Sequence, residues 1–162
     1  MITIQAFEAH QRDGVRDLIL PIQREEFGID ISYDEQPDLH DIEAFYQKGK
    51  GGFWVALDGH AVIGSIALID IGNDQVALRK MFVAAPYRGR AHGVAQKLLD
   101  HVTSEARASG VTDIYLGTTA AFLAAHRFYE KNGFDLVEAQ DLPETFPRMA
   151  VDTRFYRMAL AQ

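Results

Sequence analysis

The segment from Phe53 to Val83 restricts the fold more than any other part of the 162-residue sequence, because it holds three apolar runs separated only by short turns. The first two runs, residues 53–57 and 61–71, flank Asp58-Gly59, a pair typical of two-residue hairpin turns. A Gly72-Asn73-Asp74 turn then leads into residues 75–83. Connections this short join only antiparallel neighbours, so the sequence predicts a three-stranded antiparallel meander.

After this meander, the apolar spacing changes from that of a strand to that of a helix. Val94, Leu98 and Val102 recur every four residues, which predicts a helix that ends at Gly110. Residues 113–118 then read as a strand, and a second helix from Phe122 ends at Gly133. A strand, a helix and a further strand in this order require a parallel pair with a crossover helix. The predicted class is therefore α+β, with a mixed, mostly antiparallel central sheet and flanking helices.

The remaining segments extend this pattern on both sides. Residues 3–7 read as a first strand, and residues 15–27 as a helix that Pro21 kinks or splits. Residues 37–47 read as a second short helix with Pro37 in its first turn. Residues 134–137 and 153–160 read as strands joined by a long connection. The expected order is β–α–α–β–β–β–α–β–α–β–β, in a single domain spanning residues 1–162.

Composition excludes several classes of protein. The chain has a formal net charge of −7, so general binding to nucleic acid or to an anionic membrane surface is not expected. It has no cysteine, which excludes disulfides, thiolate metal sites and a cysteine nucleophile. Its first residues lack a basic segment followed by a long apolar run, and no stretch has the length of a membrane span. We therefore expect a cytoplasmic location.

One segment departs from this acidic composition. No acidic residue lies between Asp74 and Asp100, although five cationic side chains do: Arg79, Lys80, Arg88, Arg90 and Lys97. A basic segment in an acidic chain indicates an anionic ligand at that place. The alternative interpretation is a chance gap in acidic residues along a solvated strand and helix.

The order of elements in this segment favours the ligand. A strand that ends at Val83 is followed by a turn with Gly89 and Gly93 and then by a helix. Backbone N–H groups and the positive end of the helix dipole converge in such a turn, which suits a phosphate or pyrophosphate. The turn is neither a P-loop nor a dinucleotide fingerprint, because neither glycine pattern is present.

Two stretches of sequence resemble signatures of the GNAT N-acetyltransferase superfamily. Residues 83–93 (VAAPYRGRAHG), followed by Leu98-Leu99, are similar to motif A, which is Gln/Arg-x-x-Gly-x-Gly/Ala after an apolar strand ending in Val. Residues 125–134 (AHRFYEKNGF) resemble the second signature, Ala-x-x-Leu/Phe-Tyr-x-Lys-x-Gly-Phe. The resemblance covers roughly residues 53–138, and it implies a GNAT-like fold and an acetyl-CoA-dependent N-acetyltransferase.

The resemblance also implies roles for individual residues. The end of the third meander strand would offer its backbone to the pantetheine arm, and the turn would hold the pyrophosphate through its amides. Tyr129 would protonate the departing thiolate of coenzyme A. The cofactor residues implied in this way are Met81, Phe82, Val83, Arg88, Gly89, Arg90, Ala91, His92, Gly93 and Val94.

Three positions depart from the family pattern. Ala91 replaces a glycine, which requires a negative φ, and we expect a helical value there. Phe122 stands where many members carry an asparagine that contacts coenzyme A. Arg79 stands where many members carry the glutamate that acts as general base. A cation cannot be that base, but it can bind a carboxylate or phosphate of the acceptor. Because successive strand residues face opposite ways, we expect Arg79 and not Lys80 to face the acceptor groove.

The general base must then be another residue or an ordered water. The candidates are Glu25, Glu26, Asp34, Asp38, His40 and Asp70, of which Glu26 is also expected to contact the acceptor. The histidines lack metal-binding spacing, so no metal is expected. The expected partner is a small-molecule or peptide amine, with a homodimer as a further possibility. Two alternatives stay open: a non-catalytic acyl-CoA-binding module of the same fold, and an unrelated phosphate-binding α+β protein such as a nucleotide-binding regulator.

Overall fold

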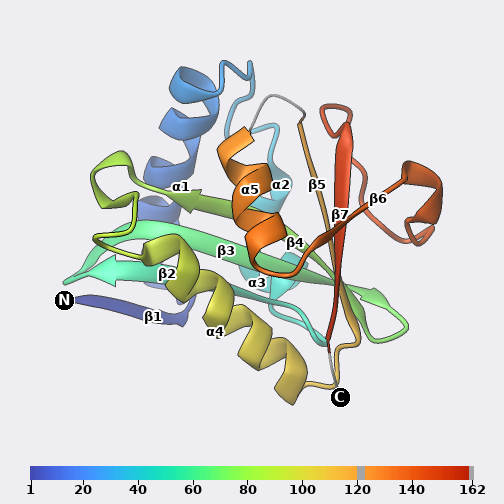
Figure 1. The fold of residues 1–162 in the computed structure, drawn as a ribbon. Coiled ribbons are helices and arrows are strands. Elements are labelled where there is room, and N and C mark those ends of the chain that lie inside the picture. Colours follow the sequence, from blue (N-terminus) through green and yellow to red (C-terminus); the bar gives the residue numbers. More distant parts are fainter. Residues whose placement is uncertain (120–122, 161–162) are drawn as a thin grey trace.

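The computed structural model describes residues 1–119 and 123–160. Over these residues, seven strands form one sheet in the order β1-β2-β3-β4-β5-β7-β6 (Figure 1). All neighbouring strands are antiparallel except β4 and β5, which are parallel and connected through helix α4. The predicted mixed, mostly antiparallel sheet is confirmed. The strands are β1 Ile2–Ala6, β2 Gly52–Asp58, β3 Ala61–Gly72, β4 Gln75–Val83, β5 Asp113–Thr118, β6 Asp135–Val137 and β7 Arg154–Ala159.

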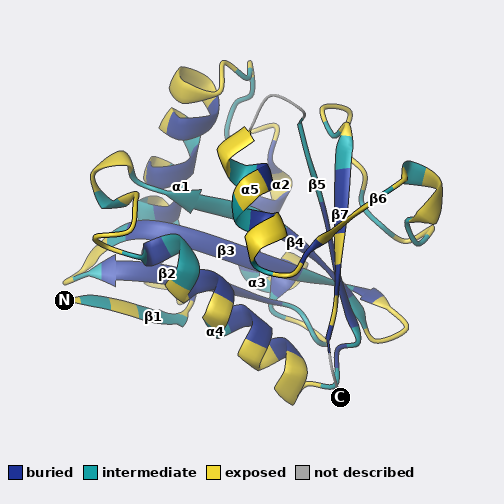
Figure 2. Cartoon of the chain, in the orientation of Figure 1, coloured by how far each residue is buried: buried dark blue, intermediate teal, exposed yellow. Residues whose placement is uncertain are grey.

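Helices cover both faces of the sheet. Helices α1 (Arg12–Pro21), α2 (Pro37–His40) and α3 (Ile42–Tyr46) pack on one face, where Phe53 and Val55 of β2 are buried against them. Helices α4 (Val94–Ala108) and α5 (Leu123–Lys131) pack on the other face, against Trp54 and Ile66. The alternation of inward and outward residues along β2 and β3 therefore supplies two cores. Figure 2 shows β2 and β3 largely buried, with exposed outer faces on the helices that cover them.

The two N-terminal helical segments show how local sequence ends a helix. α1 ends at Pro21, and a wider π-helical turn, Ile22–Glu26, continues directly from it with helical backbone on both sides, so the proline marks a change of helix type and does not split the helix. The single helix predicted for residues 37–47 is wrong, because the structure has α2 and α3 there. Asp41 separates them with a non-helical backbone, and its side chain accepts the Ala44 N–H at 3.3 Å, capping α3.

Two irregularities in β4 shape the candidate active site. Ala67 pairs with Arg79 and Ser65 with Phe82, so β4 carries one extra residue in a bulge, and Lys80 in this bulge has a φ of +52°. The Ser65 hydroxyl donates to the Lys80 carbonyl at 2.7 Å. In addition, β4 pairs with β5 only from Gln75 to Ala77. Beyond that point the two strands diverge, and Figure 1 shows β5 and β7 turned away from β2–β4 with α5 over the opening.

Candidate active site

A cavity lies where β4 and β5 diverge. One lobe of about 300 Å³ extends towards Met149 in the connection between β6 and β7. A second lobe of about 210 Å³ extends towards Tyr129 of α5. The two lobes form one continuous site, because Arg79, Lys80 and Asp152 line both of them. The cavity thus brings together cations from β4, a phenol from α5 and a carboxylate from the last connection.

Both β4 cations line this cavity, so the expectation that only one of Arg79 and Lys80 faces it is wrong. The physical reason is the bulge, whose extra residue breaks the two-residue alternation of the strand. Arg79 is half-buried, and its Nη2 donates to Met149 Sδ at 3.6 Å. Among the ion pairs of the described residues, none uses Arg79.

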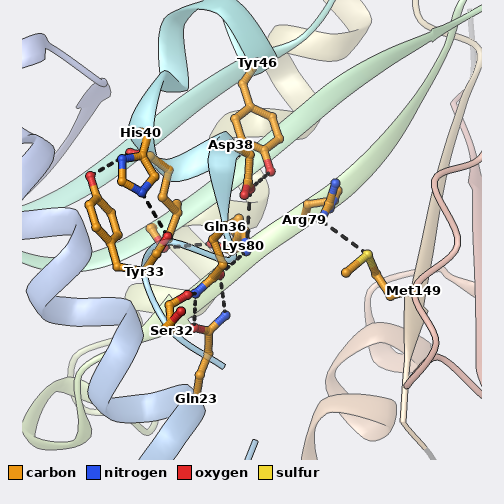
Figure 3. Close-up of polar contacts among 12 residues, drawn as sticks. Gln23, Ser32, Tyr33, Gln36, Asp38, His40, Tyr46, Arg79, Lys80 and Met149 are labelled. Atoms are coloured by element: carbon orange, nitrogen blue, oxygen red, sulfur yellow. Dashed lines mark hydrogen bonds and ion pairs between the residues drawn. The ribbon is translucent and has the colours of Figure 1, made fainter. Parts of the chain in front are cut away.

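Lys80, by contrast, is held in a buried polar network shown in Figure 3. Its Nζ donates to Gln36 Oε1 at 2.6 Å and lies 3.5 Å from Asp38 Oδ2. The Tyr46 hydroxyl donates to the same carboxylate oxygen at 2.5 Å. Burial lowers the pKa of Lys80, although Asp38 opposes this shift. Lys80 therefore joins β4 to α2, whereas Arg79 donates only to the Met149 thioether, a weak acceptor, among the described residues.

The amides of Gln23 and Gln36 complete this network. Each donates to the other's oxygen, at 3.0 and 2.9 Å, although both side chains are buried. Gln23 also lines both lobes of the cavity. Polar groups without partners would be costly at this depth, so the reciprocal pair stabilises the wall that Lys80 and α2 form.

Tyr129 reaches the cavity from α5, as the resemblance implies. Its side chain is buried among aromatic rings, with Phe134 and Tyr156 at centroid distances of 5.5 and 5.9 Å. Its hydroxyl lies 4.0 Å from Met81 Sδ. Burial raises the pKa of Tyr129 to about 12. The phenol is therefore protonated at neutral pH and serves as a hydrogen-bond donor.

Asp152 is a cavity residue that sequence reasoning missed. Its Oδ2 accepts the Met149 N–H at 3.1 Å, which shapes the end of the last connection. Burial raises the pKa of Asp152, although the Met149 N–H, Arg79 and Arg148 oppose the shift. It is the one carboxylate among the described residues that line either lobe. No signal in the sequence distinguishes it from the other acids of this connection, because its position depends on how the connection folds against β5.

The turn before α4 has the geometry of an anion site. Gly93 caps the helix with a φ of +60°, and Gly89 has a φ of +97°. The Arg88 N–H donates to Ala85 O at 3.2 Å and the Gly93 N–H to Gly89 O at 3.1 Å, so these two amides are used within the turn. Four further amides lie between these two, those of Gly89, Arg90, Ala91 and His92. In the part of the chain that the structure describes, none of the four donates a hydrogen bond to a protein acceptor.

Two further features of this turn bear on the predictions. Ala91 is not among the residues with positive φ, so its backbone suits an alanine, as expected. Arg88 makes a two-pronged ion pair with Glu26, at 2.6 and 3.0 Å, and also donates to Val83 O. The structure thus brings Glu26 to the turn and not to the cavity, where an acceptor contact was expected.

The other predicted base candidates also lie outside the cavity lining in the described part of the chain. Asp38 stands behind Lys80, bound by Tyr46. Asp70 accepts the backbone N–H groups of Lys50 and Gly72 at a turn, and these bonds lower the pKa of its carboxyl. His40 contacts the Tyr33 carbonyl at 3.0 Å. Glu25 and Asp34 line neither lobe, and Phe122 lies outside the described residues.

A split mixed sheet with a glycine-containing turn at the start of its crossover helix is typical of the acyl-CoA N-acyltransferase fold. The chain belongs to the Acetyltransferase (GNAT) family, a family of acyltransferase enzymes whose model matches residues 16–134. The described helices include none long and apolar enough to cross a bilayer.

Several known proteins are similar to this chain. An acetyltransferase of the GNAT family from Staphylococcus aureus is 40% identical, with a TM-score of 0.93 over 99% of this chain and 100% of that one. N-acetylaspartate synthetase from Danio rerio is 40% identical over 115 residues, which are 69% of this chain and 39% of that protein. The chain therefore spans less than half the length of this curated relative. Salmonella typhimurium yncA, solved with its cofactor acetyl-CoA, shares the fold at 20% identity, with a TM-score of 0.78 over 100% of this chain and 95% of that one.

Proposed function

We propose that this chain transfers an acetyl group from acetyl-CoA to the amine of a small acceptor that carries a carboxylate. The observation that carries the proposal is the position of Arg79, a guanidinium that lines the cavity between β4 and β5 and lies outside the ion pairs of the described residues. Guanidinium groups bind carboxylates in a planar, two-pronged geometry. The proposed enzyme is a single domain over residues 1–162.

The backbone around the cavity suits two parts of acetyl-CoA, the pantetheine arm and the pyrophosphate. Past Ala77, β4 no longer pairs with β5, so the edge at Met81, Phe82 and Val83 can hydrogen-bond the amides of a pantetheine arm. The turn amides near Gly89 and Gly93 can hold the pyrophosphate at the N-terminus of α4. When bound, acetyl-CoA supplies the activated thioester.

The chain's own residues then position the reaction. Without cysteine there is no thiol to carry an acyl group, so the amine attacks the thioester directly. Tyr129 is protonated and can donate a hydrogen bond to the sulfur as negative charge develops there. Arg79 holds the acceptor so that its amine lies near the thioester carbon, which lowers the entropic part of the barrier.

The proposed class of acceptor rests on the charge of Arg79 and on the name of one relative. An amino acid carries the carboxylate that Arg79 can bind and the amine that is acetylated. The Danio rerio relative is named for N-acetylaspartate, which makes aspartate the first acceptor to test. The proposal also includes a cytoplasmic location, and it leaves a homodimer as the quaternary arrangement to test by light scattering.

A thiol-release assay with acetyl-CoA tests this function. The acceptors are L-aspartate, L-glutamate, a neutral amino acid, an acidic peptide, spermidine and an aminoglycoside. We expect the highest kcat/KM with an acceptor that bears a carboxylate. Best turnover with a polyamine would overturn the assignment of Arg79. Acetyl-CoA binding without turnover of any amine would instead indicate a non-catalytic acyl-CoA-binding module.

A further inference from the structure

We infer that Asp152 is the general base that takes the proton from the acceptor amine; this inference rests on the proposed function. An amine that reaches the cavity at neutral pH arrives as an ammonium ion, which cannot attack a thioester. The position where GNAT members often carry a glutamate base holds Arg79 here. Another proton acceptor must therefore reach the cavity.

Asp152 has the position that this role requires. It lines both lobes, so it faces the Met149 side and the Tyr129 side of the cavity. Its carboxylate lies against Gly117 of β5, on the wall opposite Arg79 of β4. A cation on one wall and a carboxylate on the other match the two charges of an amino acid zwitterion. The acceptor carboxylate would bind Arg79 while its ammonium group faces Asp152.

The surroundings of Asp152 favour a proton acceptor. Burial raises the pKa of its carboxyl, which brings it closer to the working pH than an ordinary surface aspartate. The charged groups that act on it are Arg79 across the cavity and Arg148 in its own connection, and both oppose the shift. Lys80 and Tyr129 line the same cavity, while Gly117 adds no titratable group from β5.

The proton balance of the reaction can be written in full. The Asp152 carboxylate takes one proton from the ammonium group, which leaves a neutral amine. The amine nitrogen forms a bond to the thioester carbon, and the carbon–sulfur bond breaks. The second nitrogen proton is lost as the amide forms, and the thiolate sulfur becomes a thiol by taking one proton. Asp152 then releases its proton to solvent, so one ammonium and one thioester give one amide, one thiol and one free proton.

The test compares Asp152→Asn with Asp141→Asn. Asparagine keeps an oxygen that can accept the Met149 N–H, so the connection should keep its shape. Asp141 is the matched control, because its Oδ2 also accepts a backbone N–H three residues earlier, from Glu138 at 3.2 Å, outside the cavity lining. We expect Asp152→Asn to lower kcat with the best acceptor by about 10²- to 10⁴-fold. Asp141→Asn should leave kcat unchanged.

The pH profile separates a base from a structural residue. In the wild type, kcat/KM should rise with pH through the raised pKa of Asp152, and this acid limb should be absent in Asp152→Asn. Acetyl-CoA affinity, measured by calorimetry, and the unfolding midpoint should match the wild type in both variants. Retention of more than about a third of kcat, or an unchanged acid limb, would overturn the role of Asp152. Inactivity of the wild type with every amine would instead overturn the proposed function.

Discussion

A Cβ atom on Gly117 would lie 2.7 Å from Asp152 Oδ2, so the carboxylate occupies the space that a side chain on β5 would fill. Gly117 is near the end of β5, where that strand has already diverged from β4. Its lack of a side chain lets the last connection bring Asp152 against the sheet and into the cavity. The two residues are 35 positions apart in the sequence, and only the fold relates them.

Substitution of Gly117 by alanine should therefore displace the Asp152 carboxylate without removing it. A misplacement of about 1 Å in a reacting group can cost on the order of 10²-fold, and the aspartate side chain can rotate, so we expect kcat to fall about 10- to 100-fold. Steady-state kinetics with saturating acetyl-CoA measure this effect.

The control for Gly117→Ala is Gly14→Ala. A Cβ atom on Gly14 would lie 2.8 Å from Val62 Cγ2, which is also the end of a side chain, but Gly14 is in α1 and outside the cavity lining of the described residues. Equal losses of kcat in the two variants would show that crowding alone, and not the position of Asp152, accounts for the effect.

Arg79→Met tests the acceptor site. The loss of a charge-assisted hydrogen bond should cost about 1.5–3 kcal/mol, which corresponds to a rise in acceptor KM of roughly 10- to 150-fold. Acetyl-CoA affinity should not change, because the cofactor groups lie on the β4 backbone and the turn. Arg12→Met, which removes a guanidinium paired with Glu43, is the control. A normal acceptor KM in Arg79→Met would remove Arg79 from the acceptor site.

Local signals explain why most of the fold could be predicted from the sequence. The Asp58-Gly59 turn places Gly59 at a φ of +62°, and Gly110 and Gly133 follow α4 and α5 at positive φ. Each of these residues acts on its nearest neighbours, so sequence spacing is sufficient to locate it. The prediction of one helix over residues 37–47 was wrong because the Asp41 side chain binds a backbone N–H that a continuous helix would use. The spacing of apolar residues carries no information about such a side-chain bond.

The site depends on contacts that sequence spacing does not contain. Lys80 turns into the cavity because a bulge in β4, bound by the Ser65 hydroxyl of β3, breaks strand alternation. Asp152 reaches the cavity because a long connection folds back onto Gly117. Both arrangements are tertiary, so the motif predicted the turn before α4 and Tyr129 but could not predict these two residues.

Lys80→Met should destabilise the protein strongly. Lys80 and Asp38 are 9% and 10% exposed, and loss of the cation leaves a buried carboxylate with only Tyr46 as its side-chain partner in Figure 3. Breaking a buried pair in this way typically costs about 3–5 kcal/mol. The double variant Lys80→Met with Asp38→Asn should regain most of that free energy of unfolding. Urea titrations provide the measurement.

The control for this buried pair is Lys50→Met. Its ion pair with Asp74 is 33% and 55% exposed, and exposed pairs contribute only about 0–1 kcal/mol. If Lys80→Met lost no more stability than Lys50→Met, the Lys80–Asp38 pair would not stabilise the junction of β4 and α2.

Gly93→Val should abolish acetyl-CoA binding. Gly93 has a φ of +60° at the start of α4, and a branched side chain there would stand where the pyrophosphate approaches the turn amides. Backbone strain alone would cost roughly 1–2 kcal/mol of stability. Gly72→Val controls for that strain, because Gly72 has a φ of +86° with open space around it, in the β3–β4 turn. Calorimetry that gave both variants wild-type affinity would remove this turn from the cofactor site.

Tyr129→Phe should slow the chemical step while leaving the fold intact. The substitution keeps the ring that packs on Phe134 and Tyr156 and removes only the hydroxyl. Because burial raises the pKa of Tyr129 to about 12, proton transfer to a thiolate whose own pKa is about 8.5 is unfavourable. The hydroxyl then acts mainly by hydrogen bonding to the sulfur, so we expect kcat to fall by about 10²-fold, the low end for acid–base catalysis. Acetyl-CoA affinity should stay near the wild-type value, and the solvent isotope effect on kcat should increase.

Tyr115→Phe is the matched control, since Tyr115 is 7% exposed against 9% for Tyr129 and lines neither lobe in the described structure. If Tyr129→Phe kept more than about a third of kcat with chemistry rate-limiting, the hydroxyl would not stabilise the developing charge on the sulfur, and Tyr129 would only pack in the core.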